Sequence, residues 1–317
     1  MGGGHLGNSN QSISIIVGQA EGGWRLDLLL SEQLKEHSRS FLRRLIDEGH
    51  VLVNDRVAAK AGLSVRPNDR VFVTFPALGS PPTQQVIQDL GVQVVYEHAE
   101  FLIISKPAGL VVHAPKTNYE YVTLVDWLLQ HFNDLAQVGA IERPGIVHRL
   151  DLQTSGLMII PRNNQAHAFF GELFRNRLIH KTYLAVVHGH PVAQGLIDYH
   201  IVRHPTDRKK MTHVRPVDLH RGWARDARAA QTNYRVVKYL PNFSLVEAKP
   251  VTGRTHQIRV HFAAIGHGLL GDEVYGHQSK LIDRQALHAY SLEFSYLGHP
   301  YKFLVEPPAD FQRLVGE

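Results

Sequence analysis

The stretch His148-Arg149-Leu150-Asp151-Leu152-Gln153-Thr154-Ser155-Gly156 is the most informative part of this chain. It places one carboxylate, Asp151, between a cationic residue and a Thr-Ser-Gly turn. Apolar runs at 146–147 and 157–160 flank the stretch. An ionised carboxylate enclosed by apolar segments is costly unless it is paired, hydrogen-bonded or chemically active. The pattern therefore predicts that Asp151 has a charged partner or takes part in chemistry.

Length and composition indicate a globular protein with two domains. The chain has 317 residues, of which 44% are apolar and 20% charged, and each of two domains could bury its own core. We find neither an apolar run of the ~20 residues needed to span a membrane nor the pattern of a secretory signal at residues 1–10. Cysteine is absent, which excludes disulfides and thiolate metal sites and fits a reducing compartment. We expect a cytoplasmic, monomeric protein without a membrane partner.

The 21 histidines do not indicate a metal site. The pairs His188 with His190 and His200 with His204 fall in expected strands and loops, without a third ligand at suitable spacing. We therefore expect no metal.

Positive charge is concentrated in residues 203–228. This segment holds eight cations and three acids, an excess that equals the net charge of +5 of the whole chain. Contact with nucleic acid phosphates is the favoured interpretation, and a solvated loop is the alternative. The candidate contacts are Arg208, Lys209 and Lys210.

Residues from about 24 to 75 predict a small unit of two helices followed by two short strands. The second helix can be capped by Ser38 or Ser40 and can stop at Gly49. Strands are expected at 51–53 and 71–75.

The order of motifs in this unit, R-L-D-x-x-L and then S-R-S-x-x-x-x-L-I-x-x-G-x-V-x-V-N, resembles an S4 domain, a small RNA-binding module. Arg39 and Arg43 lie four residues apart on one helix face, with Arg44 beside them. The resemblance implies that these arginines bind RNA. An ordinary solvated helix face is the alternative.

The rest of the chain predicts an α+β fold, because strands are not regularly followed by helices. The predicted elements are strands at 92–96, 101–104, 183–187, 231–239 and 243–248 and helices at 123–132 and 164–176. The predicted organisation is a flexible tail (1–20), the S4-like RNA-binding domain (21–76), a linker (77–90) and a catalytic domain (91–317).

Two further motifs carry candidate site residues. In the stretch 180–187, strand alternation puts Lys181 and Tyr183 on one face. In the stretch 252–262, Thr255 can cap a helix that ends near Ile265 and is stopped by Gly266. Its buried stripe would consist of Ile258, Phe262 and Ile265, and Arg259 would emerge beside that stripe.

Together with the turn 106–113 and the segment 269–276, these motifs resemble the RluA-type pseudouridine synthases. The resemblance implies a mixed, largely antiparallel sheet behind a small α/β S4 domain. It implies that Asp151 attacks C1′ or removes the C2′ proton of the ribose, that Arg259 pairs with Asp151, and that Tyr183 packs against the target base. It further implies that Arg149 fills the place of the flipped base and that His148 supports the loop. Ile258 would form a wall of the pocket, and Arg254 would contact RNA. We assign no role to Lys106, which can be a surface residue, and interpret 269–276 as architectural.

The implied reaction isomerises uridine to pseudouridine within structured RNA. The resemblance favours 23S ribosomal RNA, free or in an assembling large subunit, as the substrate. No atoms or electrons are gained or lost, so the resemblance implies no cofactor. A non-catalytic RNA-binding or ribosome-assembly factor is the main alternative, but it predicts loss of Asp151 or Arg259, and both are present. A retaining glycosidase needs a second carboxylate about 5 Å from the first, and these motifs nominate none.

Overall fold

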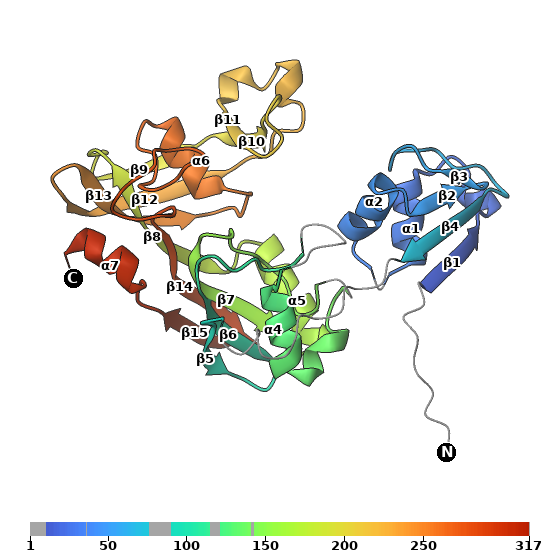
Figure 1. The fold of residues 1–317 in the computed structure, drawn as a ribbon, viewed down its shortest axis with the longest axis horizontal. Coiled ribbons are helices and arrows are strands. Elements are labelled where there is room, and N and C mark those ends of the chain that lie inside the picture. The colour runs from blue at the N-terminus through green and yellow to red at the C-terminus, as the bar shows by residue number, and fades with distance from the viewer. Residues whose placement is uncertain (1–10, 36, 76–89, 115–120, 141–142, 317) are drawn as a thin grey trace. The chain divides into compact units, whose positions relative to one another are not determined.

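The computed structural model describes residues 11–35, 37–75, 90–114, 121–140 and 143–316 (Figure 1). It divides into two compact units. The first comprises residues 1–88 and 113–145, and the second comprises residues 89–112 and 146–317. Each is described by itself.

The first unit contains an antiparallel sheet with strand order β1-β4-β2-β3, packed against two helices. A third helix, α4, is capped by Thr123, which forms a reciprocal capping box with Asp126. The elements are β1 (Gln11–Ile16), α1 (Leu26–Gln33), α2 (Arg39–Asp47), β2 (Val51–Val53), β3 (Arg56–Val57), β4 (Arg70–Phe75) and α4 (Leu124–His131).

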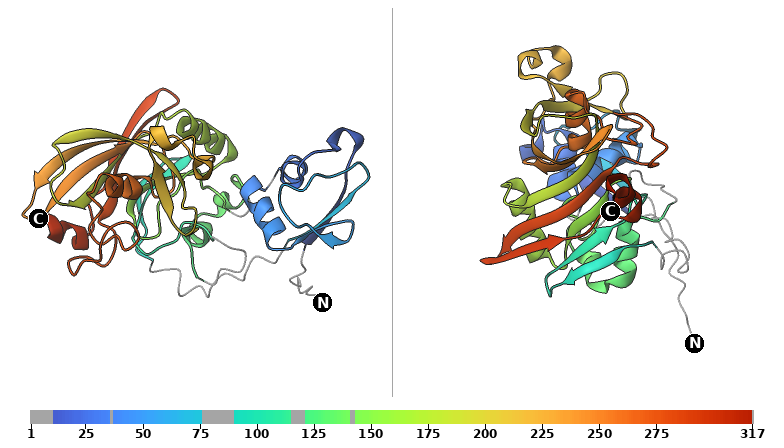
Figure 2. Two further views of the ribbon diagram at one scale, coloured as in Figure 1. Left: turned by 90° about the horizontal axis from the view of Figure 1, so that it is seen from above. Right: turned by 90° about the vertical axis from the view of Figure 1, so that its left-hand side faces the viewer.

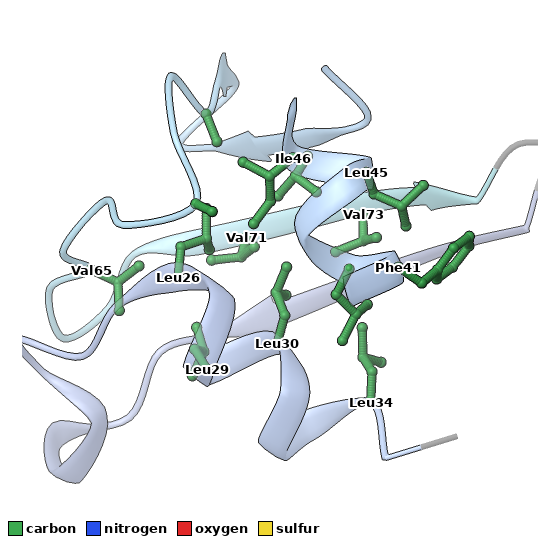
Figure 3. Close-up of a cluster of buried hydrophobic side chains, with 14 of the residues drawn as sticks. Leu26, Leu29, Leu30, Leu34, Phe41, Leu45, Ile46, Val65, Val71 and Val73 are labelled. Carbon is green, nitrogen blue, oxygen red and sulfur yellow. The ribbon is translucent and has the colours of Figure 1, made fainter. Parts of the chain in front are cut away.

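The core of this unit lies between its helices and its sheet (Figure 3). Leu26, Leu29 and Leu30 from α1 are fully buried, because their i, i+3, i+4 spacing places them on one helix face. They meet Leu45 of α2 and Val71 of β4 in one cluster. Ser38 precedes helix α2, and its Oγ accepts a hydrogen bond from the Phe41 amide at 3.3 Å, so Ser38 rather than Ser40 is the cap.

Strand β1 was not predicted from the sequence. A flexible tail was expected over residues 1–20, but Gln11–Ile16 pairs with β4 in register from Gln11–Phe75 to Ile16–Arg70. The prediction is therefore wrong for this part. Alternation of serine and isoleucine over 12–16 is the strand signal that it overlooked. Residues 1–10 of the tail and 76–89, which hold most of the expected linker, lie outside the described residues.

The second unit is built on a nine-stranded sheet, with β15 paired to β14 and the order β5-β6-β7-β14-β8-β13-β12-β9 (Figures 1 and 2). The β7–β14 pair is parallel, whereas its other pairs are antiparallel. This confirms the expected mixed, largely antiparallel sheet. The strands are β5 (Gln93–Glu97), β6 (Phe101–Lys106), β7 (Ser155–Pro161), β8 (His180–His188), β9 (Gln194–Asp198), β12 (Gln231–Tyr239), β13 (Phe243–Pro250), β14 (Leu287–Tyr296) and β15 (His299–Leu304).

Helices cover both faces of this sheet. Helix α5 (Asn164–Arg175) buries Phe170 against β6, β7 and β14. Helix α6 (Gln257–Ala264) packs on Ala185 and Val187 of β8, whereas α7 (Ala309–Val315) packs on Val186. Because neighbouring strand residues point to opposite faces, α6 and α7 lie on opposite sides. No helix in the described ranges is long and apolar enough to span a membrane.

A hairpin of β10 (His200–Arg203) and β11 (Met211–Val214) stands out from the large sheet (Figure 1). Residues 204–210 form its turn, so the expected basic segment begins with this hairpin. Figure 2 shows from the side that the hairpin and the short helical turns after it extend from the rest of the second unit.

Candidate active site

A cavity of about 470 Å³ lies in the second unit, between the loop before β7, strand β8 and the loop leading into α6. Cavities of this size suit a small molecule or a single nucleotide. Seven residues predicted from the sequence line it together, namely His148, Arg149, Asp151, Tyr183, Arg254, Ile258 and Arg259. The structure thus brings three motifs that are far apart in the chain to one site.

The parallel pairing of β7 with β14 explains the glycine of the Thr-Ser-Gly turn. Gly156 has a φ of +116°, and a Cβ at this position would lie 2.3 Å from the carbonyl oxygen of Ala289. Only glycine combines this backbone with so close an approach. Beside it, Ser155 Oγ and His288 Nδ1 are 2.9 Å apart, which ties the start of β7 to β14.

Lys106 holds the loop that carries Asp151. Its side chain is completely buried, and its Nζ donates to the carbonyl oxygens of Pro107, Leu110 and Leu152 at 2.7, 2.9 and 3.2 Å. Burial lowers the pKa of Lys106 to about 7. The interpretation of Lys106 as a surface residue is therefore wrong. Its aliphatic stem passes through the core and its amine fixes the residue that follows Asp151.

Arg284 supports the same loop from another direction. Its Nη1 donates to the carbonyl oxygen of Gln153 at 3.3 Å, while Nε and Nη2 donate to both oxygens of Asp310 at 2.7 and 2.9 Å. The Lys106 amine and the Arg284 guanidinium thus hold the consecutive carbonyl oxygens of Leu152 and Gln153. Asp151 is therefore carried by a fixed backbone.

Arg259 lies between two carboxylates. Its Nη1 donates to Asp151 Oδ2 at 3.1 Å, so the pairing predicted from the sequence is present. Its Nε and Nη2 donate to both oxygens of Asp272 at 2.7 and 2.9 Å. The Asp272 side chain is fully buried, whereas that of Asp151 is 20% exposed. Asp272 therefore anchors the guanidinium, and the cavity can reach Asp151.

Sequence reasoning missed Asp272 as a site residue because the segment 269–276 was interpreted as architectural. Its Oδ1 also accepts from the amides of Val274 and Tyr275 at 3.0 and 3.1 Å. The spacing of an aspartate two and three residues before these amides is a signal of an Asx-type turn. That signal predicts the turn, but not the arginine that it anchors.

The start of α6 differs from the prediction. His256, not Thr255, is the residue before the first helical position. It adopts a left-handed conformation with a φ of +57°. The buried Gln257 fixes this turn, because its Oε1 accepts from Thr252 Oγ1 at 2.6 Å and from the Arg254 amide at 3.0 Å. The expected stripe of Ile258, Phe262 and Ile265 does pack in one cluster.

Tyr183 and Lys181 both line the cavity from β8, as strand alternation predicted. Burial, aided by the charge of Asp151, raises the pKa of Tyr183. The phenol therefore keeps its proton at neutral pH and cannot act as a base there. Burial lowers the pKa of Lys181, and its Nζ lies 5.7 Å from the centre of the Phe174 ring.

His148 and Arg149 differ in their surroundings. His148 Nε2 accepts from the Ile159 amide at 2.8 Å, and its ring stacks on Phe174 at 4.5 Å. Burial lowers the pKa of His148 to about 3, so the ring is neutral and braces the loop against β7. Arg149 is exposed and lines the cavity.

The basic residues predicted to bind RNA are exposed to different degrees. Arg208 and Lys209 are exposed and Lys210 is half-buried on the turn of the β10–β11 hairpin. Lys210 lies 3.9 Å from Asp207, a distance typical of a weak surface pair. Arg254 is exposed beside the cavity and donates from Nε to the Ala229 carbonyl at 3.1 Å.

The three arginines of α2 are engaged within the first unit. Arg39 and Arg25 both contact the buried Asp27, at 2.7 and 2.9 Å, so the R-L-D motif has a structural role. Arg43 lies 3.8 Å from Asp47, and Arg44 donates to the Ala114 carbonyl at 3.2 Å. Arg39 and Arg43 remain more than half exposed. In the described ranges, His, Asp and Glu side chains form no group of three that could hold a metal ion.

Comparison with known proteins gives consistent matches for both units. The profile of the RNA pseudouridylate synthase family matches residues 100–264, and that of the S4 domain matches residues 24–71. The chain is 38% identical over 310 residues to an uncharacterized RNA pseudouridine synthase of Aquifex aeolicus, covering 92% of this chain and 93% of the relative. It is also 38% identical over 305 residues to the ribosomal large subunit pseudouridine synthase D of Zymomonas mobilis, with the same coverage. Among solved structures, human RNA pseudouridylate synthase domain containing 1 has a TM-score of 0.57 and 26% identity, over 69% of this chain and 84% of that one.

Proposed function

Because the chain belongs to the RNA pseudouridine synthase family, whose members are isomerases, and carries an S4 RNA-binding domain, we propose that it converts uridine to pseudouridine in large-subunit ribosomal RNA. In this proposal Asp151 is the residue that acts on the ribose. In this reaction the bond from uracil N1 to ribose C1′ breaks and a bond from C5 to C1′ forms. N1 gains a proton and C5 loses one, so the atoms balance.

The contact between Asp151 and Arg259 carries this proposal. Attack on C1′ and removal of the C2′ proton both need an ionised carboxylate that the ribose can reach. Arg259 Nη1 lies 3.1 Å from Asp151 Oδ2. The bare Coulomb attraction between two unit charges at about 4 Å is roughly 4 kcal/mol at an effective dielectric of 20, before the cost of removing both charges from water is subtracted. The partial exposure of Asp151 to the cavity supplies the access.

Other lining residues suit a flipped uridine. We propose that the ring of Tyr183 packs against the uracil, because its retained proton leaves stacking as its role. Ile258, which is 5% exposed, would form an apolar wall. Turning a base out of its stack costs a few kcal/mol. The exposed, planar guanidinium of Arg149 is suited to fill the vacated space.

The choice of large-subunit ribosomal RNA has two supports. The relative from Zymomonas mobilis is named for that substrate, and the chain concentrates positive charge in 203–228, which suits phosphate contacts that set register. We propose that residues 21–76 bind RNA through Arg39, Arg43 and Arg44, that 77–90 link the domains, and that 91–317 carry catalysis. Arg208, Lys209, Lys210 and Arg254 would add contacts beside the cavity.

The test is to incubate the full-length chain with a large-subunit ribosomal RNA transcript and to map pseudouridines by chemical sequencing. We expect specific sites with the wild-type protein and none with Asp151→Asn, while RNA affinity stays within about twofold. Asparagine keeps the size and shape of the aspartate side chain but removes its charge.

Two outcomes would contradict the proposal. Modification at the wild-type rate by Asp151→Asn would remove Asp151 from the mechanism. Pseudouridines formed in transfer RNA but not in the ribosomal transcript would leave the activity intact and refute the substrate.

A further inference from the structure

A chain of hydrogen-bonding groups leads from the basic hairpin to Asp151. The Met211 amide donates to Tyr275 Oη at 2.7 Å, and Tyr275 Oη lies 2.8 Å from His256 Nδ1. His256 Nε2 in turn lies 3.9 Å from Asp151 Oδ2. The roles deduced above for the cavity residues involve neither His256 nor Tyr275.

The positions of the protons follow from the partners. A backbone amide can only donate, so Tyr275 Oη accepts from Met211. Burial raises the pKa of Tyr275, so the hydroxyl keeps its own proton and can donate it to His256 Nδ1. Burial lowers the pKa of His256, although Asp151 acts in the opposite direction. The ring is therefore neutral, and the tautomer that suits both contacts carries its single proton on Nε2, which faces Asp151.

The backbone at His256 is a second observation. Its φ of +57° is uncommon for a residue other than glycine, and such conformations gather at functional sites. Glycine or asparagine would fit this turn with less strain. The imidazole is therefore not explained by the local backbone, but it is explained by the two contacts that its nitrogens make.

We propose that His256 is a positioning residue that orients Asp151 and is itself oriented by Tyr275; the proposal rests on the proposed role of Asp151. Arg259 Nη1 and His256 Nε2 both approach Oδ2. Oδ1 has no hydrogen-bond partner among the described residues, so Oδ1 is the oxygen presented to the ribose.

The charged groups around His256 are consistent with this role. Asp151 and Asp272 favour a proton on the ring, and Arg259 and Arg149 disfavour it. At 3.9 Å the Nε2–H group is beyond ordinary hydrogen-bond length, so in this structure it acts on Oδ2 as an oriented dipole.

The arrangement also connects the RNA-facing hairpin to the site. Met211 is the first residue of β11, directly after the turn that carries Arg208, Lys209 and Lys210. If RNA contacts this turn, the hydrogen-bonded path from the turn to His256 consists of only two groups, the Met211 amide and the Tyr275 hydroxyl.

The first experiment measures the tautomer without any activity. We would record ¹⁵N-edited spectra of the full-length chain with labelled histidine, and assign His256 by comparison with His256→Asn. We expect protonated Nε2 and unprotonated Nδ1 in the wild-type protein, and loss of this preference in Tyr275→Phe. Protonated Nδ1 in the wild-type protein would overturn the proposal.

The second experiment measures single-turnover rates on the large-subunit transcript at saturating enzyme. Tyr275→Phe keeps the ring that lies 5.0 Å from the Arg259 guanidinium carbon, and His256→Asn suits the left-handed backbone. We expect both variants to lower the saturated rate on the order of tenfold, since a misplaced reacting group can cost up to about a hundredfold. The RNA affinity should stay within about twofold. The acidic limb of the pH–rate profile should move to higher pH, because a donor near the carboxylate is lost.

Tyr239→Phe is the matched control, since its hydroxyl donates to the Pro191 carbonyl at 3.0 Å, outside the cavity. It should leave rate and profile unchanged. An unchanged rate in His256→Asn, or a lower rate without a shift of the acidic limb, overturns the proposal. Should Tyr275→Phe fail to fold, His256→Asn decides. If Asp151→Asn retained activity, the proposed function itself would fail. That result can be told apart from the two outcomes that overturn the role of His256.

Discussion

Asp272 and Asp151, the two carboxylates that Arg259 contacts, should differ in how much their replacement lowers stability. In Asp272→Asn the guanidinium loses its bidentate acceptor, and an amide donor can face Arg259 Nε. Removing one partner of a buried ion pair typically costs about 3–5 kcal/mol. Arg259 keeps Asp151 at 3.1 Å, so we expect a loss of roughly 2–4 kcal/mol in the free energy of unfolding of the second unit.

In Asp151→Asn the guanidinium keeps both hydrogen bonds to Asp272. The Asp151 side chain is 20% exposed, and partly solvated pairs contribute about 0–1 kcal/mol. Stability should therefore change by less than about 1 kcal/mol, while turnover disappears. Asp272→Asn should also lower turnover, by roughly tenfold to a hundredfold, because the guanidinium can shift.

The assay is urea-dependent hydrogen exchange of amides in β8 and β13, which reports the second unit by itself. Single-turnover rates are measured on the same samples. The reasoning is refuted if Asp151→Asn destabilises the unit as much as Asp272→Asn does, because Asp151 would then be the structural anchor. Full stability of Asp272→Asn would refute it equally.

Three further predictions concern other charged groups. Lys106 has a folded pKa of about 7 against about 10.4 unfolded, so between these values only the unfolded chain holds the proton and the free energy of unfolding rises by about 1.4 kcal/mol per pH unit. Lys106→Met should abolish this rise in urea titrations from about pH 7.5 to 9.5, and equal slopes in both proteins would contradict it. His148 has a folded pKa of about 3 against about 6.5 unfolded, so its contribution to stability is lost as pH falls through this window. The free energy of unfolding of His148→Gln should therefore depend less on pH between about 6 and 4. An unchanged dependence would show that His148 is not a source of the pH dependence. Changing Lys209 and Lys210 to glutamine should reduce the slope of log affinity against log salt by up to roughly 0.7–0.9 per lost phosphate contact, whereas an unaltered slope would show that the hairpin turn does not bind RNA.

Sequence patterns predicted the elements whose periodicity is local. Strands at 231–239 and 243–248 and the helix at 164–176 were expected nearly at their observed bounds, because alternation and the i, i+4 spacing are properties of each segment alone. The Asp151–Arg259 contact, between residues 108 positions apart, came from the resemblance of the motifs and not from periodicity.

The residues that hold the site in place could not be predicted in this way. Lys106 follows a buried strand and precedes a turn, a position that also suits a surface lysine. Its burial is decided by three carbonyl acceptors, one of which comes from Leu152. Likewise the length of a turn does not reveal that Asp272 accepts from Arg259. Such partners are set by tertiary contacts between distant segments, which a single sequence does not contain.

The geometry around Arg259 explains why arginine, and not lysine, occupies this position. Nε and Nη2 lie on one edge of the planar guanidinium and bind both oxygens of Asp272, while Nη1 extends toward Asp151. A lysine has one nitrogen on a flexible stem, so it could not donate two parallel hydrogen bonds to one carboxylate and a third, in a fixed direction, to another. With the guanidinium anchored at 6% exposure, its contact to Asp151 is in place before any ligand enters the cavity. Because the buried Asp272 holds the guanidinium, Arg259 presents its positive charge at a fixed place beside Asp151. A fixed positive charge is what an ionised Asp151 would need.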